Sequence, residues 1–334
     1  RGKRSIVVDL KNPAGRAVFL DLVGTADVVV ENFRPGTMSK LGVDYNSLSA
    51  VNPRLIMASV SGFGQTGPYA ERAALDIVVQ AMGGMLSITG EEGGGPVRPG
   101  VSQGDITAAL FTVIGLLSAT VERSRSGLGQ HLDLSMLDCQ AAILENPLMR
   151  YFAVGEMPER LGTRHPVSAP VAALPTKDGY VAIAVTDGPS GHWGRFGELI
   201  GRRDLIEDER FISNWQRRVH YQELLPHLIS ALAKKTTEEW VALLSEAGIA
   251  VGPVQDVSQV AKDPQLVSRS MFVQADGPSV GPVTFTNTPL KHSRTPGGVL
   301  RGAPELGEHT EELLREAGVG EKRVAALWAS GAVA

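Results

Sequence analysis

The chain has 334 residues, of which 43% are hydrophobic and 20% charged, and its formal net charge is −4. This length allows two domains, because a domain typically takes about 100–200 residues. The net negative charge and the absence of a basic run argue against a nucleic-acid-binding surface, where lysines and arginines cluster. The longest apolar stretches, such as residues 108–119, are interrupted by Thr or Ser and are shorter than the roughly 20 residues that span a bilayer. We therefore expect neither a nucleic-acid-binding protein nor a membrane protein.

Cysteine and histidine give little support for metal or thiol chemistry. The single cysteine, Cys139, has no partner for an intramolecular disulfide, which fits a reducing cytoplasm. Nothing adjacent to Cys139 would lower its pKa, so we interpret it as a packing residue rather than a nucleophile. The seven histidines are scattered and form none of the pairs that bind zinc. We expect a cytoplasmic protein without a bound metal.

The first third of the chain alternates predicted strands and helices. Residues 5–10 have the composition of a strand, and an amphipathic helix follows from residue 12 to residue 24. Two apolar runs of the buried-strand type come next, at residues 27–30 and 55–60, and each ends in a loop rich in turn residues. This order predicts a parallel sheet covered by helices, with ligands bound at the loops after the carboxyl ends of the strands.

A long helix is predicted from about residue 104 to residue 124, followed by a short strand at residues 131–134. Ser135 is placed to cap a further helix that runs to about residue 153. A second region begins near residue 166, and from residue 282 the chain returns to loop and strand before a polar helix from residue 308. In the second region we predict a strand at residues 179–185 and helices at residues 193–200, 226–233 and 237–247.

The glycine-rich segment at residues 93–96 lacks both the lysine and the strand–turn–helix setting of a phosphate-binding loop. We interpret it as a flexible hairpin or lid.

Two aspartates stand at predicted helix starts. Asp138 lies in the first turn of a helix that directly follows a strand. A helix N-terminus favours an ionised carboxylate there, which is the state that a nucleophile needs. The same position also suits an acidic residue that only caps the helix, and local sequence alone favours capping. Asp105, at the head of the preceding helix, has the same two interpretations.

Short blocks that are weak singly occur in a specific order and spacing along nearly the whole chain. They lie at residues 1–6 (RGKRSI), 31–36 (ENFRPG), 52–56 (NPRLI), 61–64 (SGFG), 80–84 (QAMGG), 104–105 (GD), 127–130 (GLGQ), 135–138 (SMLD) and 306–310 (LGEHT). Together these blocks resemble the class III CoA-transferase family, the group that contains formyl-CoA transferase and carnitine CoA-transferase.

The resemblance implies an α/β fold, with a Rossmann-like large domain built on a parallel sheet, a smaller α+β domain, and two interlocked subunits. It implies a large CoA-binding domain at residues 1–140, a linker at 141–170, a small domain at 171–285 and a C-terminal segment at 286–334 that returns to the large domain. Family members begin with a further N-terminal stretch, so we expect part of the large domain to be missing from this sequence.

The resemblance implies that Asp138, which ends the family's S-M-x-D block, is the catalytic carboxylate. Asp138 would attack an acyl-CoA thioester to give a mixed anhydride, which CoA thiolate converts to an aspartyl-CoA thioester. A carboxylic acid would then take the CoA. The donor implied is succinyl-CoA or a similar small acyl-CoA, and no metal or redox cofactor is required. The partners implied are acyl-CoA, a small carboxylic acid and a second copy of the chain.

Two loops resemble the family's CoA-contacting segments. In the first, an aromatic ring could pack on adenine and a guanidinium could meet a phosphate. In the second, glycines would let the backbone approach the pantetheine arm. The residues implied are Asn32, Phe33 and Arg34 in the first loop and Ser61, Gly62, Phe63 and Gly64 in the second.

Two other functions remain open. The same superfamily contains α-methylacyl-CoA racemase, which places a catalytic histidine in a G-H-D-x-x-Y block and a second catalytic aspartate at the position of Asp105. Here the corresponding stretch, residues 72–77 (RAALDI), has no histidine, whereas the transferase aspartate is present. Leu75 stands where relatives often have an aromatic residue. Asp105 is therefore a candidate racemase-type base or a supporting residue. A CoA-binding relative without enzymatic activity is the third possibility. We rank the transferase first, the racemase second and the binding-only protein third.

Overall fold

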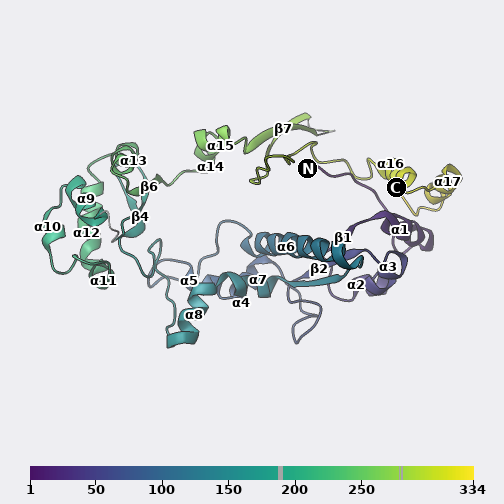
Figure 1. Cartoon of the computed structure of the whole chain (residues 1–334), viewed down its shortest axis with the longest axis horizontal. Helices are drawn as coiled ribbons and strands as arrows, with labels where there is room; N and C mark the ends of the chain where they lie inside the picture. Colours follow the sequence, from purple (N-terminus) through teal and green to yellow (C-terminus); the bar gives the residue numbers. More distant parts are fainter. Residues whose placement is uncertain (187–190, 278, 280) are drawn as a thin grey trace. The chain divides into compact units, whose positions relative to one another are not determined.

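The computed structural model describes residues 1–186, 191–277, 279 and 281–334. The chain divides into two compact units, which are considered separately (Figure 1). The first contains Arg1–Ser87, Arg98–Pro158 and Pro264–Ala334, and the second contains Ile88–Val97 and Glu159–Asp263. The predicted domain boundaries at residues 140, 170 and 285 stay a prediction.

A parallel sheet organises the first unit. Strands β1 (Val28–Glu31), β2 (Ile56–Ser61) and β3 (His131–Ser135) lie in the order β1-β2-β3, and both pairings are parallel. In the register between β2 and β3, Ser61 lies opposite Ser135. The predicted mixed α/β fold with a parallel sheet is confirmed. Consequently, the loops that leave β1 and β2 begin at the same edge of the sheet as the start of the helix that follows β3.

Short helices and one long helix accompany this sheet. The helices before the second unit are α1 (Pro13–Thr25), α2 (Thr37–Leu41), α3 (Tyr45–Val51), α4 (Asp76–Met82), α5 (Met85–Ile88), α6 (Gln103–Ser126), α7 (Met136–Ile143) and α8 (Glu145–Val154). The C-terminal part adds α15 (Pro264–Ser268), the antiparallel hairpin of β7 (Phe272–Gly277) and β8 (Gly281–Thr286), and helices α16 (Thr310–Glu316) and α17 (Glu321–Ala329).

Helix α6 is the central packing element of this unit. Its small and polar residues Gly104, Thr107, Ala108, Thr112 and Ala119 are buried, and the helix contacts β2, β3, α4 and α7. It runs for 24 residues, and by length and composition alone it is apolar enough to cross a membrane. The long helix predicted from about residue 104 to residue 124 is confirmed. Its apolar part is longer than the stretch at residues 108–119 on which the expectation about membranes was based, although core helices of water-soluble proteins pass the same test.

Four predicted elements differ from the structure. The helix predicted at residues 226–233 begins earlier, since α12 spans Tyr221–Leu232. Residues 5–10 form no strand, because this segment meets residues near the C-terminus through the single bridge between Val8 and Val333. The helix predicted to run from Ser135 to residue 153 is divided, since α7 ends at Ile143 and α8 begins at Glu145. The polar C-terminal segment forms two helices, α16 and α17, instead of one.

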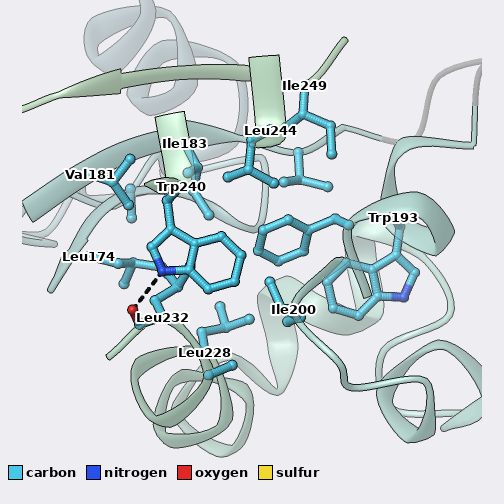
Figure 2. Packing of buried hydrophobic residues seen from close by; sticks show 14 of the residues in the cluster. Leu174, Val181, Ile183, Trp193, Ile200, Leu228, Leu232, Trp240, Leu244 and Ile249 are labelled. Carbon is cyan, nitrogen blue, oxygen red and sulfur yellow. Dashed lines mark hydrogen bonds between the residues drawn. The ribbon is translucent and has the colours of Figure 1, made fainter. Parts of the chain in front are cut away.

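The second unit is a small α+β unit built on the antiparallel sheet β4-β5-β6. Its core is apolar and includes Phe196. Figure 2 shows Trp193 and Trp240 in this core. The indole Nε1 of Trp240 donates a hydrogen bond to the carbonyl oxygen of Leu232 at 2.7 Å, so this buried polar atom is satisfied. The elements are β4 (Val171–Pro175), β5 (Tyr180–Ala184), α9 (His192–Leu199), α10 (Asp204–Glu207), α11 (Asn214–Val219), α12 (Tyr221–Leu232), α13 (Thr237–Glu246), β6 (Ala250–Pro253) and α14 (Val257–Val260).

Candidate active site

A cavity of about 970 Å³ lies in the first unit, beside the carboxyl ends of β1 and β2. This volume suits a ligand larger than a simple metabolite, since small-molecule sites typically occupy about 300–1,000 Å³. Most of the wall surface is apolar, but several polar and charged side chains also line it. The wall residues with charged or polar side chains are Asn32, Arg34, Ser61, Arg72, Asp76, Arg98, Ser102, Asp105 and Thr112.

The loop after β1 supplies one part of the wall. The side-chain amide of Asn32 donates a hydrogen bond to the carbonyl oxygen of Val60 at 2.7 Å, which ties this loop to the end of β2. The backbone N–H of Phe33 donates to the carboxylate of Glu31 at 2.7 Å. With the backbone held in this way, the side chains of Phe33 and Arg34 remain exposed at the cavity. An exposed ring beside an arginine is suited to a ligand with a flat aromatic group and an anion.

The segment after β2 supplies another part. Ser61 and Gly62 line the cavity, and a Cβ atom at Gly62 would collide with the side chain of Ala74. Phe63 lies elsewhere, since it is only 9% exposed and packs in the core with Val79 and other apolar residues. Gly64 also lies outside the wall, with a φ of +85° that favours glycine. The structure therefore brings together only part of this predicted loop.

The hydroxyl of Ser61 is an unpartnered polar group on the wall. Ser61 is 4% exposed, and its Oγ has no hydrogen-bond partner among the residues that the structure describes. Buried polar groups are usually paired, and an unpaired one at a cavity is a candidate contact for a ligand. Ser59, two residues earlier on β2, is different, because its Oγ lies 2.9 Å from Nε2 of His131.

Asp138 lies in the first turn of α7 with its side chain exposed, and it is not one of the residues that line the cavity. Its backbone N–H donates to Oγ of Ser135 at 3.1 Å, so the predicted cap by Ser135 is confirmed. The turn is joined to the wall, since the N–H of Leu137 donates to the carbonyl oxygen of Gly62 at 3.0 Å. Met136, in the same turn, lines the cavity. The carboxylate of Asp138 is therefore attached to a turn that borders the cavity.

A hydrogen-bonded cluster joins the starts of α4 and α6. The carboxylate of Asp76 accepts from Arg98 Nη2 at 2.9 Å, from Gln80 Nε2 at 2.7 Å and from the backbone N–H of Gly104 at 2.8 Å. Burial opposes ionisation of this carboxyl, but the hydrogen bonds from Gln80, Arg98 and the amides of Gly104 and Asp105 outweigh it and lower the pKa of Asp76.

Asp105 lines the same cavity and has the opposite shift. Desolvation raises the pKa of the Asp105 carboxyl, and the nearby negative charge of Asp76 raises it further, while Arg98 opposes both effects. Asp105 is thus the cavity carboxyl that takes up a proton more readily.

Sequence analysis missed three charged wall residues, Arg72, Asp76 and Arg98. The guanidinium carbon of Arg72 lies 4.7 Å from the centre of the Tyr69 ring, a cation–π contact. Asp76 belongs to residues 72–77, the stretch that was compared with the racemase block. Its position was therefore noted in the sequence, but its hydrogen bonds to Arg98 and Gly104 were not predicted. Nothing local indicated that Arg98 pairs with a carboxylate 22 residues earlier.

Two other predictions concern residues outside the wall. Cys139 is 5% exposed in the core, and burial, followed by the charge of Asp138, raises the pKa of its thiol. Both facts support the packing interpretation. In the second unit, the glycine-rich segment is held by hydrogen bonds from Arg160 to the carbonyl oxygen of Gly94 and from Arg164 to Glu92. That it forms a flexible lid stays a prediction. Among the described residues, no group of histidine, cysteine and acidic side chains is arranged to hold a metal ion.

Comparison with known proteins identifies the family. Residues 1–310 match CoA-transferase family III. The chain is 39% identical over 316 residues to a succinate–glutarate CoA-transferase of Agrobacterium fabrum, with 95% of this chain and 78% of the relative covered. It is 40% identical over 319 residues to an acetyl-CoA:oxalate CoA-transferase of Acetobacter aceti, with 95% and 80% covered.

Solved structures agree with this assignment. A CaiB/BaiF family protein from Brucella suis has a TM-score of 0.85 and 39% identity, and the match covers 95% of this chain and 82% of that one. A protein from M. tuberculosis has a TM-score of 0.83 and 32% identity, with 94% and 83% covered. The chain belongs to CoA-transferase family III. It is a CoA-transferase, which uses acyl-CoA as a substrate.

Proposed function

We propose that this enzyme carries CoA on Asp138 while it moves CoA from an acyl-CoA donor to a carboxylic acid. The carboxylate of Asp138 attacks the thioester carbonyl, which forms an acyl–aspartyl anhydride and releases CoA thiolate. The thiolate attacks the aspartyl carbonyl, which releases the first acid and leaves an aspartyl-CoA thioester. The acceptor carboxylate attacks this thioester, giving a second anhydride and CoA thiolate. The thiolate then attacks the acceptor's carbonyl, so that the new acyl-CoA leaves and the Asp138 carboxylate is restored.

The observation that carries this proposal is the attachment of Asp138 to a turn at the cavity. Its side chain is exposed, and the same turn contributes Met136 to the wall and bonds to Gly62 through Leu137. A nucleophile must be accessible and fixed relative to its substrate, because orientation lowers the barrier of each attack. The backbone bonds of this turn supply the fixation.

For CoA itself, we propose the loops after β1 and β2. Phe33 is 50% exposed at the cavity, which suits stacking on adenine. Arg34 and Arg72 line the same cavity and would meet phosphate groups, for which guanidinium is well suited. Ser61 and Gly62 would contact the pantetheine arm. Asn32, on the wall, would support these loops through its side-chain bond to Val60, and Phe63 and Gly64 would support them from outside the wall.

For the exchanged acids, we propose small dicarboxylates, with succinyl-CoA or a similar small acyl-CoA as donor. Relatives are named for succinate and glutarate, for oxalate and for mesaconate. Each of these acids has two carboxyl groups. This proposal rests on those names, because Arg34 and Arg72 on the cavity wall are already assigned to the phosphates of CoA.

We also propose that the enzyme is an interlocked homodimer in the cytoplasm. Support comes from α6, whose apolar side chains on one face are each at least 48% exposed. A second copy of the chain would cover this face and remove it from water. The residues of the face are Ile106, Leu110, Val113, Ile114, Leu117 and Val121. The buried single cysteine, Cys139, is compatible with a reducing compartment.

A racemase is the second candidate function, and Asp105 is the observation that favours it. This carboxyl lines the cavity and has a raised pKa, as a proton-transferring base would. However, no histidine is among the described residues that line the cavity, and the stretch compared with the racemase block, residues 72–77, contains none. A racemase removes a proton from one face of the α-carbon and returns a proton to the opposite face. Asp105 could do one of these steps, but no histidine is present among these residues for the other.

The test compares Asp138→Asn with Asp105→Asn. The asparagine at residue 138 keeps the shape of the side chain but is a poor nucleophile, so we expect CoA exchange to fall by at least about 10³-fold. CoA binding, measured at equilibrium, should be retained. Asp105→Asn is the matched control and should keep most of the exchange activity. If Asp105→Asn instead abolishes α-proton exchange of a branched acyl-CoA while Asp138→Asn has no effect, the racemase is correct. CoA binding by the unaltered protein with neither activity would identify a binding-only protein.

A further inference from the structure

Arg72 reaches the cavity wall from a tight turn. Its backbone N–H donates to the carbonyl oxygen of Tyr69 at 2.9 Å, so the two residues close this turn. The guanidinium lies over the aromatic ring of Tyr69, with 4.7 Å between the guanidinium carbon and the ring centre. The ring centre of Phe63 lies 5.8 Å from the same carbon. The charged end of Arg72 therefore lies against two rings that precede it in the same loop.

Both rings are fixed by the surrounding structure. Phe63 is 9% exposed and packs in the core with Val79. Tyr69 packs edge-to-face on Phe63, with 5.7 Å between the ring centres and 68° between the ring planes. The loop between them is attached to strand β3, since the backbone N–H of Gln65 donates to the carboxylate of Asp133 at 2.9 Å. Tyr69 is thus connected to the core, and it is not one of the residues that line the cavity.

The rings contact Arg72 without using its hydrogen-bond donors. A guanidinium has five N–H donors, and a cation–π contact with a ring face binds none of them to an acceptor. Among the residues that the structure describes, no carboxylate or other acceptor bonds to the guanidinium of Arg72. Arg98, on the same wall, is different because its guanidinium is paired with Asp76 at 2.9 Å. Arg72 therefore offers the cavity a positive charge that no described carboxylate neutralises.

A phosphate group is suited to a cation of this kind. Guanidinium binds phosphate through parallel N–H···O bonds, so the strength of the contact depends on how the guanidinium is oriented. An unrestrained arginine side chain loses rotamer freedom when it binds, and a side chain that already lies against a ring loses less. The ring of Tyr69 supplies this restraint through its face, so the effect does not require the phenolic hydroxyl.

We infer that Tyr69 is a positioning residue, which holds the guanidinium of Arg72 at the wall so that it binds a phosphate group of CoA. This inference rests on the proposed function, since that proposal assigns Arg72 to the phosphates. Tyr69 does not contact CoA itself and takes no part in the transfer. Its effect on CoA binding passes through Arg72.

The experiment is a double-mutant cycle on the affinity for free CoA, measured by titration calorimetry. Arg72→Met should raise the Kd by about 10- to 100-fold, the effect of losing a hydrogen bond to a charged group. Tyr69→Ala should raise it by about two- to fivefold, the effect of losing an exposed cation–π contact. In the Arg72→Met protein, Tyr69→Ala should leave the Kd nearly unchanged, because the cation that Tyr69 positions is gone.

Three further variants separate the ring from the fold. Tyr69→Phe keeps the ring, so we expect it to bind CoA as the unaltered protein does. Tyr69→Leu keeps an apolar side chain against Phe63 but has no ring, so it should weaken binding, and it decides the question if Tyr69→Ala does not fold. Trp215→Ala is the matched control, since it removes an exposed ring that lies 5.1 Å from the guanidinium carbon of Arg218 in the second unit. It should leave the Kd unchanged.

The outcomes distinguish the role of Arg72 from that of Tyr69. If Arg72→Met binds CoA as tightly as the unaltered protein, the proposed assignment of Arg72 to the phosphates is wrong. If Arg72→Met weakens binding but the substitutions of Tyr69 have no effect, or weaken binding equally with and without Arg72, only the positioning role of Tyr69 is wrong. A Tyr69→Phe variant as weak as Tyr69→Leu would also exclude that role, because the hydroxyl and not the ring would then be required.

Discussion

The carboxylate of Asp76 accepts a hydrogen bond from the backbone N–H of Gly104 at 2.8 Å and so links the first residue of α4 to the first turn of α6. Ser102, which precedes α6, makes no side-chain capping bond. Asp76, on a different helix, therefore accepts the hydrogen bond from the Gly104 amide that a capping residue of α6 would normally accept. The same carboxylate holds Arg98, so one residue supports both the helix and the cavity wall.

Replacing Asp76 should destabilise the fold. In Asp76→Ala the amide of Gly104, the amide of Gln80 and the partly buried guanidinium of Arg98 would lose an acceptor. We expect the free energy of unfolding to fall by about 2–4 kcal/mol, measured by urea denaturation. Glu71→Ala, at an exposed position nearby in the sequence, should change it by less than about 0.5 kcal/mol. Equal stability of the two variants would contradict this role of Asp76.

The contribution of Asp76 should depend on acid pH. Its pKa in the folded protein is below the ordinary value of 3.8, so folding favours the ionised form. That contribution is complete above pH 3.8 and is lost as the pH falls through the lowered pKa. The stability difference between the unaltered protein and Asp76→Ala should therefore shrink below pH 3.8 and stay constant between pH 5 and pH 7, about one unit or more above it. A difference that grows on acidification would contradict the direction of this shift.

Ser59 and Ser61 on strand β2 give a matched pair. Ser59→Ala removes the hydrogen bond to His131, so we expect a loss of about 1 kcal/mol in the free energy of unfolding. Ser61→Ala removes a buried hydroxyl without a partner among the described residues, so stability should be unchanged or slightly higher. Because the Ser61 hydroxyl is proposed to contact acyl-CoA, Ser61→Ala should also raise the KM for acyl-CoA about tenfold. Ser61→Ala that loses stability but not affinity would show a structural role only.

The exposed face of α6 should mediate association. Sedimentation of the unaltered protein should show a dimer, and combining Leu110→Glu with Leu117→Glu should shift the population towards monomer, because charges on an apolar interface are costly. Val257→Glu, at an even more exposed apolar position on α14, should leave the dimer intact. A monomeric unaltered protein, or a dimer that tolerates both substitutions on α6, would exclude this face as the interface.

The parallel sheet, the long helix α6 and the cap at Ser135 could be predicted because their signals are local. Apolar runs mark β1 and β2, and Ser135 stands directly between a strand and a helix. Residues 5–10 show where this reasoning fails. Their composition is that of a strand, but strand formation requires a partner, and the C-terminal segment offers only the bridge from Val333 to Val8.

Only the parts of the site that have a local sequence signal could be predicted. The loop containing Asn32, Phe33 and Arg34 could be located because a turn after a buried strand is recognisable from sequence. The pairing of Arg98 with Asp76 could not, since it depends on how α4 and the loop before α6 meet in space. Phe63 illustrates a further limit. Its aromatic ring was expected at the ligand, but it fills the core between β2 and α6.

The most direct test of the covalent role of Asp138 follows oxygen atoms. The enzyme is incubated with an acyl-CoA and a dicarboxylic acid whose carboxyl groups contain heavy oxygen, and the peptide containing Asp138 is then analysed by mass spectrometry. In the proposed sequence, the bridging oxygen of the second anhydride comes from the acceptor acid and stays on Asp138. We therefore predict heavy oxygen in the side chain of Asp138 after turnover, and none when acyl-CoA is left out of the incubation. Complete CoA exchange without label at Asp138, or with label on another carboxylate, would contradict the account.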